Sequence, residues 1–416
     1  MDTNMGFNVE EAPGFGEIDN LLGLLEYGDD SSSSDSSSGS SGLGYKKEDL
    51  VELDVAHVSI PKKDVINVLG ISSLLSSGGE NSFEGKVTSM KIENGVVRFL
   101  LSDNKRYVDK EVDILNEKNQ FEGFIAFNSS FLARTIKACN SIVTFIQREV
   151  EGEKKYSLKI IGGEIGLDSI KMDESKFNKP ITYKNSVSCN KEPIITSAKR
   201  LYGITASSIR SGKSINFFNK SVQSSSINST ATIEINEPVP DFKLPLTDVK
   251  ILTGLCSFDE SATVNISTDG SVFEGSSFKF KTESFQITSS SMDAVASRMF
   301  DFDGAVASLG HLTQINDLAY GLDSSTGNVR FNYEDGFVSF EIVSKRDNSK
   351  VIINGVKSEA VQHLEGDVEI SSISLRGALS VFSGYKDIGV VISPDGVALF
   401  SGNIKVAILG NYLGKK

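Results

Sequence analysis

The 416-residue sequence contains no tryptophan and only three histidines, three cysteines and eight prolines. The histidines are far apart and have no cysteine or carboxylate neighbours at ligand spacing, which argues against a zinc site or a nucleophilic catalytic group. The cysteines are odd in number and form no C-x-x-C pair, which predicts free thiols in a reducing compartment. These residues are His57, His311 and His363, and Cys139, Cys189 and Cys256.

Long apolar runs and an excess of positive charge are also missing. No apolar run approaches eighteen residues and no opening segment resembles a signal peptide, so we expect a protein of the cytoplasm that does not contact a membrane. The net charge of −13 argues against a surface that coats itself with nucleic acid or anionic lipid. A local basic stripe can still lie within an acidic molecule, so net charge alone does not decide DNA binding.

Motifs of catalysis are weak. The segment "SGKS" at 211–214 resembles the end of a phosphate loop, but Ser207 stands where such a loop requires glycine. The Asp-Gly pairs, including "DFDG" at 301–304, are explained by hairpin turns. We therefore predict no catalytic site, no metal and no cofactor, and a protein that is not an enzyme.

What the chain does contain begins with a biased N-terminus. Residues 29–48 are rich in Ser, Gly and Asp, which predicts a flexible linker. Residues 1–28 form an acidic tail that carries an isolated apolar cluster around "IDNLLGLLEY". This tail is interpreted as a tethered peptide that docks into a groove and competes with partner peptides; the alternative is that it packs on its own domain.

From about residue 54 onward, one order of elements recurs: a strand, a helix of eight to twelve residues, then two or three strands joined by tight turns. The copy that begins near Val55 has an Asn94-Gly95 hairpin signal. The copy near 192–204 is the least clear, because its strands "SINFFN" and "ATIEIN" flank a Ser-rich gap. The pattern predicts six β-α-β-β-β units that pair into three domains, at 49–182, 183–291 and 292–416.

This layout resembles the DNA polymerase sliding clamps, the superfamily of the bacterial beta-clamp and proliferating cell nuclear antigen. The segment "VPDFKLPL" at 239–246 also looks like the Pro-Asp-aromatic segment of bacterial clamps. The resemblance implies an α+β fold, the DNA clamp fold, with three two-unit domains that form a homodimeric ring. It further implies a processivity factor for DNA replication, in a bacterial or phage-infected cell, that encircles double-stranded DNA and binds peptides of a DNA polymerase and a clamp loader.

Two other functions stay open at this point. One is a β-rich viral structural or assembly protein without DNA in its centre, and the other is a clamp-like transcription co-activator. The clamp interpretation requires positive charge to converge on one inward surface.

The helices support that requirement in part. In the helix that follows Ser130, Leu132 and Ile136 lie on one side, while Arg134 and Lys137 lie on the other. Cations on the faces that point away from the sheets are expected to contact phosphates. The candidates for DNA contact are Lys63, Arg134, Lys137, Arg200, Lys250 and Arg376. The helix around Leu312 offers no basic residue.

The C-terminal segment supplies the candidate groove for partners. Clamps of this kind bind short apolar peptides beside their C-terminal segment, and the chain ends in "VAILGNYLGKK". The resemblance therefore implies a partner-binding wall formed by Ile408, Leu409, Tyr412 and Leu413.

Overall fold

The structure is a computed structural model, and it describes most of the chain from Tyr45 to Gly414. The described ranges are 45–76, 86–177, 181–206, 213–226, 228–285, 287, 291–299, 305–322, 327–334, 337–343, 350–357 and 366–414. The predicted tail and most of the predicted linker lie outside these ranges.

The first three repeated units contain the following elements. Unit 1 consists of β1 (His57–Pro61), α2 (Lys62–Ser76), β2 (Val87–Glu93), β3 (Val96–Ser102) and β4 (Tyr107–Asp113). Unit 2 consists of β5 (Gly123–Asn128), α3 (Ser129–Thr135), the 3-10 turn η3 (Ile136–Ala138), β6 (Ile142–Val150), β7 (Glu153–Ile160) and β8 (Gly163–Leu167). Unit 3 consists of β9 (Ser186–Asn190), α4 (Lys191–Arg200), α5 (Tyr202–Ala206), β10 (Ser214–Phe218), β11 (Ser221–Ser225) and β12 (Ser229–Glu234).

The last three units repeat the order. Unit 4 consists of β13 (Phe242–Pro245), α6 (Leu246–Ser257), β14 (Thr263–Ser267), β15 (Val272–Glu274) and β16 (Phe278–Lys281), and α7 (Ser291–Met299) follows it. Unit 5 consists of β17 (Ala305–Ser308), α8 (Leu309–Leu322), β18 (Asn328–Glu334), β19 (Phe337–Val343) and β20 (Lys350–Lys357). Unit 6 consists of β21 (Gly366–Ser371), α9 (Ser372–Val381), β22 (Asp387–Ser393), β23 (Gly396–Ser401), β24 (Ile404–Leu409) and β25 (Asn411–Gly414).

Successive units interlock in pairs. The first strand of each unit pairs with the strands of the other unit of its pair: β1 with β6 and β5 with β2, β9 with β14 and β13 with β10, β17 with β22 and β21 with β18. Because neither unit has a complete sheet alone, each pair of units is one domain. The three pairs span 57–167, 186–281 and 305–414, each within one of the domain ranges predicted from the sequence.

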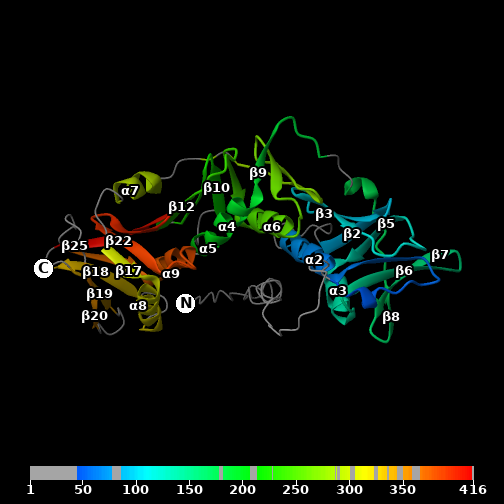
Figure 1. Cartoon of the computed structure of the whole chain (residues 1–416), viewed down its shortest axis with the longest axis horizontal. Helices are drawn as coiled ribbons and strands as arrows, with labels where there is room; N and C mark the ends of the chain where they lie inside the picture. The colour runs from blue at the N-terminus through cyan, green and yellow to red at the C-terminus, as the bar shows by residue number, and fades with distance from the viewer. Residues whose placement is uncertain are drawn as a thin grey trace, which may run out of the picture.

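The sheets continue across both domain boundaries. One eight-stranded sheet, sheet B, joins domains 1 and 2 through β4 and β16, and another, sheet C, joins domains 2 and 3 through β12 and β24. The chain forms an arch in which the strands lie on the convex side and α2, α6, α5 and α9 line the concave side (Figure 1). Sheet A (β1-β6-β7-β8) has β8 at one edge and sheet D (β20-β19-β18-β21-β25) has β20 at one edge, and neither pairs on its outer side with another strand of the described residues.

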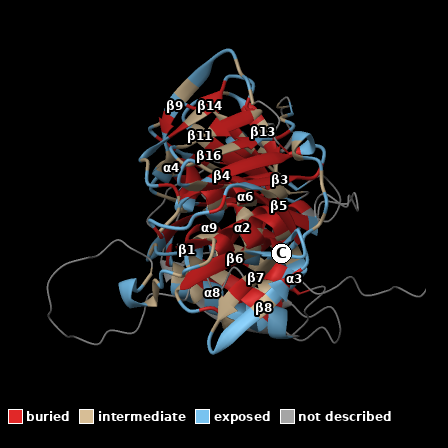
Figure 2. Cartoon of the chain, turned by 90° about the vertical axis from the view of Figure 1, so that its right-hand side faces the viewer, coloured by how far each residue is buried: buried red, intermediate tan, exposed pale blue. Residues whose placement is uncertain are grey.

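Burial follows this layered arrangement. Apolar stripes of the helices pack on the inner faces of the sheets, as Val65, Leu132 and Leu375 show with 0 % exposure. In Figure 2 most strands are buried, whereas the edge strand β8 is largely exposed. The three cysteines are free, as predicted, and the structure buries all three. Among the described residues no helix is long and apolar enough to cross a membrane.

The junction between domains 1 and 2 contains a buried ion pair. Arg106 Nη1 lies 3.1 Å from Asp248 Oδ1, and Arg106 Nε donates to Asp103 Oδ2 at 2.7 Å. The side chains of the three residues are less than a tenth exposed. The second carboxylate oxygen of Asp248 accepts from Thr282. This cluster connects the loop before β4 in domain 1 to α6 in domain 2.

Two elements differ from the sequence expectation. The Ser-rich gap contains β11, in which Val222 and Ser224 are fully buried between β10 and β12. The Ser224 hydroxyl finds its partner on the neighbouring helix α5, where Thr205 Oγ1 lies 2.7 Å from Ser224 Oγ. Helix α7 was not expected, and it packs Ala296 and Met299 on sheet C, on the face opposite α9.

Candidate nucleic-acid interface

Asparagine residues at two strand ends start the helices on the concave side. Asn128 ends β5 and accepts a hydrogen bond from Phe131 N at 3.0 Å, which caps α3. Asn190 ends β9 and caps α4 in the same way, through Glu192 N at 3.3 Å. Such caps satisfy amide groups that the first helical turn leaves free. The strands thus lead directly into the helices and fix which side of each helix faces the sheet.

Helix α3 and the η3 turn have the polarity predicted from the sequence. Leu132, Ile136 and Cys139 are at most 3 % exposed and face the sheet. Arg134 and Lys137 are exposed on the opposite side. Two cations of domain 1 therefore project away from the sheet.

Three further candidates lie over aromatic rings of neighbouring segments. Lys63 Nζ is 5.5 Å from the ring centroid of Phe258, Lys250 Nζ is 5.8 Å from that of Tyr202, and Arg376 Cζ is 4.7 Å from that of Tyr320. A cation over a ring face gains about 0.5–1 kcal/mol at an exposed site. Lys63 and Arg376 are exposed and Lys250 is half-buried. The rings hold these side chains in place at helix–helix contacts.

Arg200 is placed differently. Its Nη1 donates to Val381 O at 3.1 Å and to Ser383 O at 2.9 Å, and the side chain is half-buried. These carbonyls lie at the C-terminal end of α9, where a cation interacts favourably with the helix dipole. The residue connects domain 2 to domain 3, a contact that the sequence does not reveal.

The remaining helices complete the charge distribution. Lys199 on α4 is exposed, with Nζ 3.4 Å from Ser257 Oγ. It was not among the residues predicted to contact DNA, although it adjoins Arg200. On α8 the exposed residues include Gln314 and Asp317, in agreement with the expected lack of basic residues there. The acidic Glu192 is also exposed on α4. Exposed cations nevertheless come from helices of all three domains. Helices α2, α6, α5 and α9 lie on the concave side of the arch (Figure 1).

The four residues predicted for a partner groove are divided between two strands. Ile408 in β24 is 0 % exposed and Leu409 is half-buried. Tyr412 and Leu413 in β25 are 43 % and 46 % exposed. Only the latter pair is well exposed.

Comparisons with known proteins agree with the geometry at the level of the fold. No family model and no curated protein sequence matches the chain. Among solved structures, the DNA polymerase III beta subunit of Thermotoga maritima superposes with a TM-score of 0.71 at 10 % identity, over 86 % of this chain and 100 % of that chain. The chain has the sliding-clamp fold. The predicted α+β clamp architecture is thereby confirmed.

Other sliding clamps give similar superpositions. The DNA polymerase III beta chain of Streptococcus pneumoniae has a TM-score of 0.66 and 16 % identity, covering 85 % of this chain and 99 % of that chain. The Helicobacter pylori beta clamp, solved with a bound DNA ligase peptide, has a TM-score of 0.64 and 14 % identity with the same coverage. The resemblance thus extends over nearly the full length of these clamps.

Proposed function

We propose that this protein is a non-enzymatic sliding clamp that encircles double-stranded DNA and tethers a replicative DNA polymerase. The observation that carries the proposal is the arrangement of cations from all three domains on helices of the concave side. Contacts to phosphates hold a duplex without reading its sequence. A viral structural protein without DNA in its centre leaves this arrangement unexplained.

Ring closure follows from the pairing rule inside the chain. The third strand after the helix of unit 1 pairs with that of unit 4 (β4 with β16), and the third strand after the helices of unit 3 pairs with that of unit 6 (β12 with β24). The same rule applied to units 2 and 5 pairs β8 of one copy with β20 of a second copy. Two arches joined in this way at both ends form a homodimeric ring.

The helices support the same pairing. At the domain boundaries α2 contacts α6, and α5 contacts α9. Gly203 lies close to α9 at the second contact, where an added Cβ would lie 2.0 Å from Ser380 Oγ and 3.1 Å from Ser380 Cβ. The corresponding helices at the two free ends are α3 and α8, and each exposes a large apolar side chain, Phe131 at 40 % and Leu318 at 53 %. We assign these two side chains to the contact between copies.

Partner binding is the second half of the proposal. A DNA ligase peptide is bound in the Helicobacter pylori clamp structure. By analogy, short apolar peptides of a DNA polymerase and a clamp loader are the partners proposed here. Tyr412 and Leu413, the exposed pair of β25, are the part of the predicted groove available to them.

The topological test uses circular DNA. Protein loaded on a nicked circle should remain bound through gel filtration in about 0.5 M salt, where phosphate contacts are screened and linkage alone holds the ring. Cutting the circle once with a restriction enzyme should release it. The measurement is the fraction of protein that co-elutes with DNA before and after cutting.

The control DNA is the same linear product with a bulky protein bound at each end. The clamp should be retained on this blocked DNA, because it cannot slide off. Equal retention on circular and unblocked linear DNA would refute encirclement.

The contact between copies has its own prediction. Leu318→Glu would bury an unpaired carboxylate at each α3–α8 contact, at a cost of about 3 kcal/mol. We expect the dimer dissociation constant to rise at least about 100-fold, measured by sedimentation velocity over a concentration series. Val51→Glu, at a position that is 40 % exposed in domain 1, is the matched control and should leave the dimer intact. A Leu318→Glu protein that still sediments as a dimer would show that α8 lies outside the interface.

A further inference from the structure

The described chain begins with a segment fastened to domain 1. Lys46 N donates to Ser141 Oγ at 2.8 Å, and Asp49 Oδ2 accepts from Ser141 N at 3.1 Å and from Ser141 Oγ at 2.6 Å. These hydrogen bonds lower the pKa of Asp49. The point from which residues 1–44 extend is therefore held next to Ser141.

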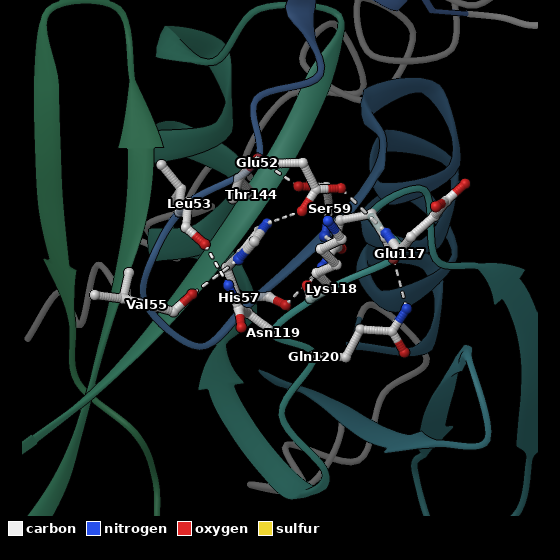
Figure 3. Close-up of polar contacts among 11 residues, drawn as sticks. Glu52, Leu53, Val55, His57, Ser59, Glu117, Lys118, Asn119, Gln120 and Thr144 are labelled. Atoms are coloured by element: carbon white, nitrogen blue, oxygen red, sulfur yellow. Dashed lines mark hydrogen bonds and ion pairs between the residues drawn. The ribbon is translucent and has the colours of Figure 1, made fainter.

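The rest of this segment is fixed as well. Glu52 Oε1 accepts from Glu117 N at 3.1 Å, and Leu53 O accepts from Asn119 Nδ2 at 2.7 Å. Figure 3 shows these contacts beside His57, whose Nε2 lies 3.7 Å from Glu52 Oε2. A chain held at both Ser141 and the Glu117–Asn119 loop gives its N-terminal extension a defined origin.

That origin adjoins the basic side of α3 and η3. Ser141 follows Lys137 by four residues, a separation of at most about 14 Å along the chain. We define the N-terminal basic patch as Lys46, Lys47, Arg134 and Lys137, all of which are exposed. Two acidic residues follow Lys47 in the chain: Glu48, which is exposed, and Asp49, which is bonded to Ser141.

The N-terminal extension has the complementary charge. Residues 1–44 contain nine Asp and Glu and no Lys, Arg or His, so the remainder of the chain has 46 acidic residues against all 42 basic ones. Most of the net charge of −13 thus comes from about a tenth of the sequence. The acidic residues are Asp2, Glu10, Glu11, Glu17, Asp19, Glu26, Asp29, Asp30 and Asp35.

We propose that residues 1–44 bind the N-terminal basic patch of their own chain and compete there with DNA phosphates. The competition rests on the proposed function, whereas the contact between tail and patch does not. A Ser/Gly-rich stretch of 15 residues has an r.m.s. span of roughly 20 Å, which suffices to bring the acids before and within it to α3. Tethering at such distances gives an effective concentration of about 1 mM.

The expected size of the effect follows from these numbers. A weak electrostatic contact with a dissociation constant of about 0.1 mM, at an effective concentration of about 1 mM, weakens DNA binding about ten-fold. The contact is screened by salt, so the inhibition should decline as salt rises. The tail is then a salt-sensitive competitor of DNA, and it leaves the N-terminal basic patch only where enough phosphates are present to displace it.

The test is a double-mutant cycle on the full-length protein. Deletion of residues 1–44, and separately Asp→Asn and Glu→Gln changes at its nine acids, should each tighten binding to a short linear duplex about ten-fold at 50 mM salt. In an Arg134→Gln/Lys137→Gln background the same deletion should tighten binding less than about three-fold. In the matched Lys154→Gln/Lys220→Gln background, which alters the start of β7 and the turn between β10 and β11, the ten-fold effect should persist.

A measurement without DNA separates this proposal from the proposed function. Carbodiimide, which couples carboxylates to lysine amines, should join tail peptides to Lys46, Lys47 or Lys137. If these cross-links form but neither the parent protein nor any variant binds DNA, the proposed clamp function is wrong and the contact between the tail and the N-terminal basic patch still holds. Cross-links elsewhere, or an equal deletion effect in both glutamine backgrounds, would overturn the contact. A different outcome would assign the tail to an apolar groove. In that case the inhibition of DNA binding would be abolished by Leu→Ser changes at Leu21, Leu22, Leu24 and Leu25, and it would persist when the nine tail acids are changed to Asn and Gln.

Discussion

Replacement of Lys63, Arg134, Lys137 and Arg376 by glutamine should flatten the salt dependence of DNA binding by up to about 3.6 units in a log–log plot. Each phosphate contact releases condensed counterions and contributes about −0.9 to that slope. Arg200 is omitted from the set because its guanidinium donates to carbonyls of domain 3. The measurement is a fluorescence-anisotropy titration of a labelled duplex between 50 and 300 mM salt.

A matched variant with equal charge makes this result specific. Glutamine at Lys118, Lys154, Lys171 and Lys220 also removes four exposed lysines, none of which lies in a helix. This control should lower affinity slightly and leave the slope within about half a unit of the parent. Equal slopes for both variants would show that DNA does not contact the concave helices.

Loss of the Arg106 side chain should produce the largest change in stability. Arg106→Met leaves Asp248 buried without its cation, which typically costs about 3–5 kcal/mol. The free energy of unfolding, from urea denaturation of the first transition, reports the change. Arg106→Met/Asp248→Leu, which removes both charges, should recover much of the loss, although Asp103 Oδ2 loses its guanidinium donor and the Thr282 hydroxyl loses its acceptor.

The same site predicts a dependence on pH. Burial raises the pKa of Asp248 above its ordinary value, while Arg106 and Thr282 oppose the shift. A carboxyl group whose pKa is raised on folding binds its proton more tightly in the folded state, so it favours folding most at low pH and this advantage is lost as the pH rises through the folded-state pKa. Removal of Arg106 should raise this pKa further. The Arg106→Met protein should therefore lose more stability at pH 7 than near pH 4, and a pH-independent difference would contradict this account.

The order of elements could be predicted from the sequence because apolar periodicity and Gly-containing turns are local. The helix faces were predictable for the same reason, since Leu132 and Ile136 are spaced to share one side. β11 was missed because it has serines and a glutamine at positions where apolar residues would have indicated a buried strand. The partners that satisfy its hydroxyl groups, such as Thr205, become apparent only in the folded structure. α7 was missed because this short helix has only three apolar residues that pack on the sheet, too few to show a helical period in the sequence.

The pairing of the strands could not be predicted from local patterns. Nothing in the sequence of β1 indicates that it pairs with β6 rather than with β2, because strand exchange depends on the whole domain. Arg200 illustrates the same limit at the candidate site. It was predicted to contact DNA, but its guanidinium donates to carbonyls that lie more than 180 residues away along the chain.

The continuous sheets across both domain boundaries have a kinetic consequence. Sheets B and C build the bend of the arch into each chain, so assembly of a ring from two such chains does not require six separate domains to be ordered relative to one another. In a closed ring of this kind, we call each β8–β20 contact between copies a seam. The ring can open at a seam without breaking the strand pairing between domains of one chain. The residence time of the protein on circular DNA is then set by the time that a seam takes to open. A weakened seam should shorten this residence time and leave the affinity of the concave helices for DNA unchanged.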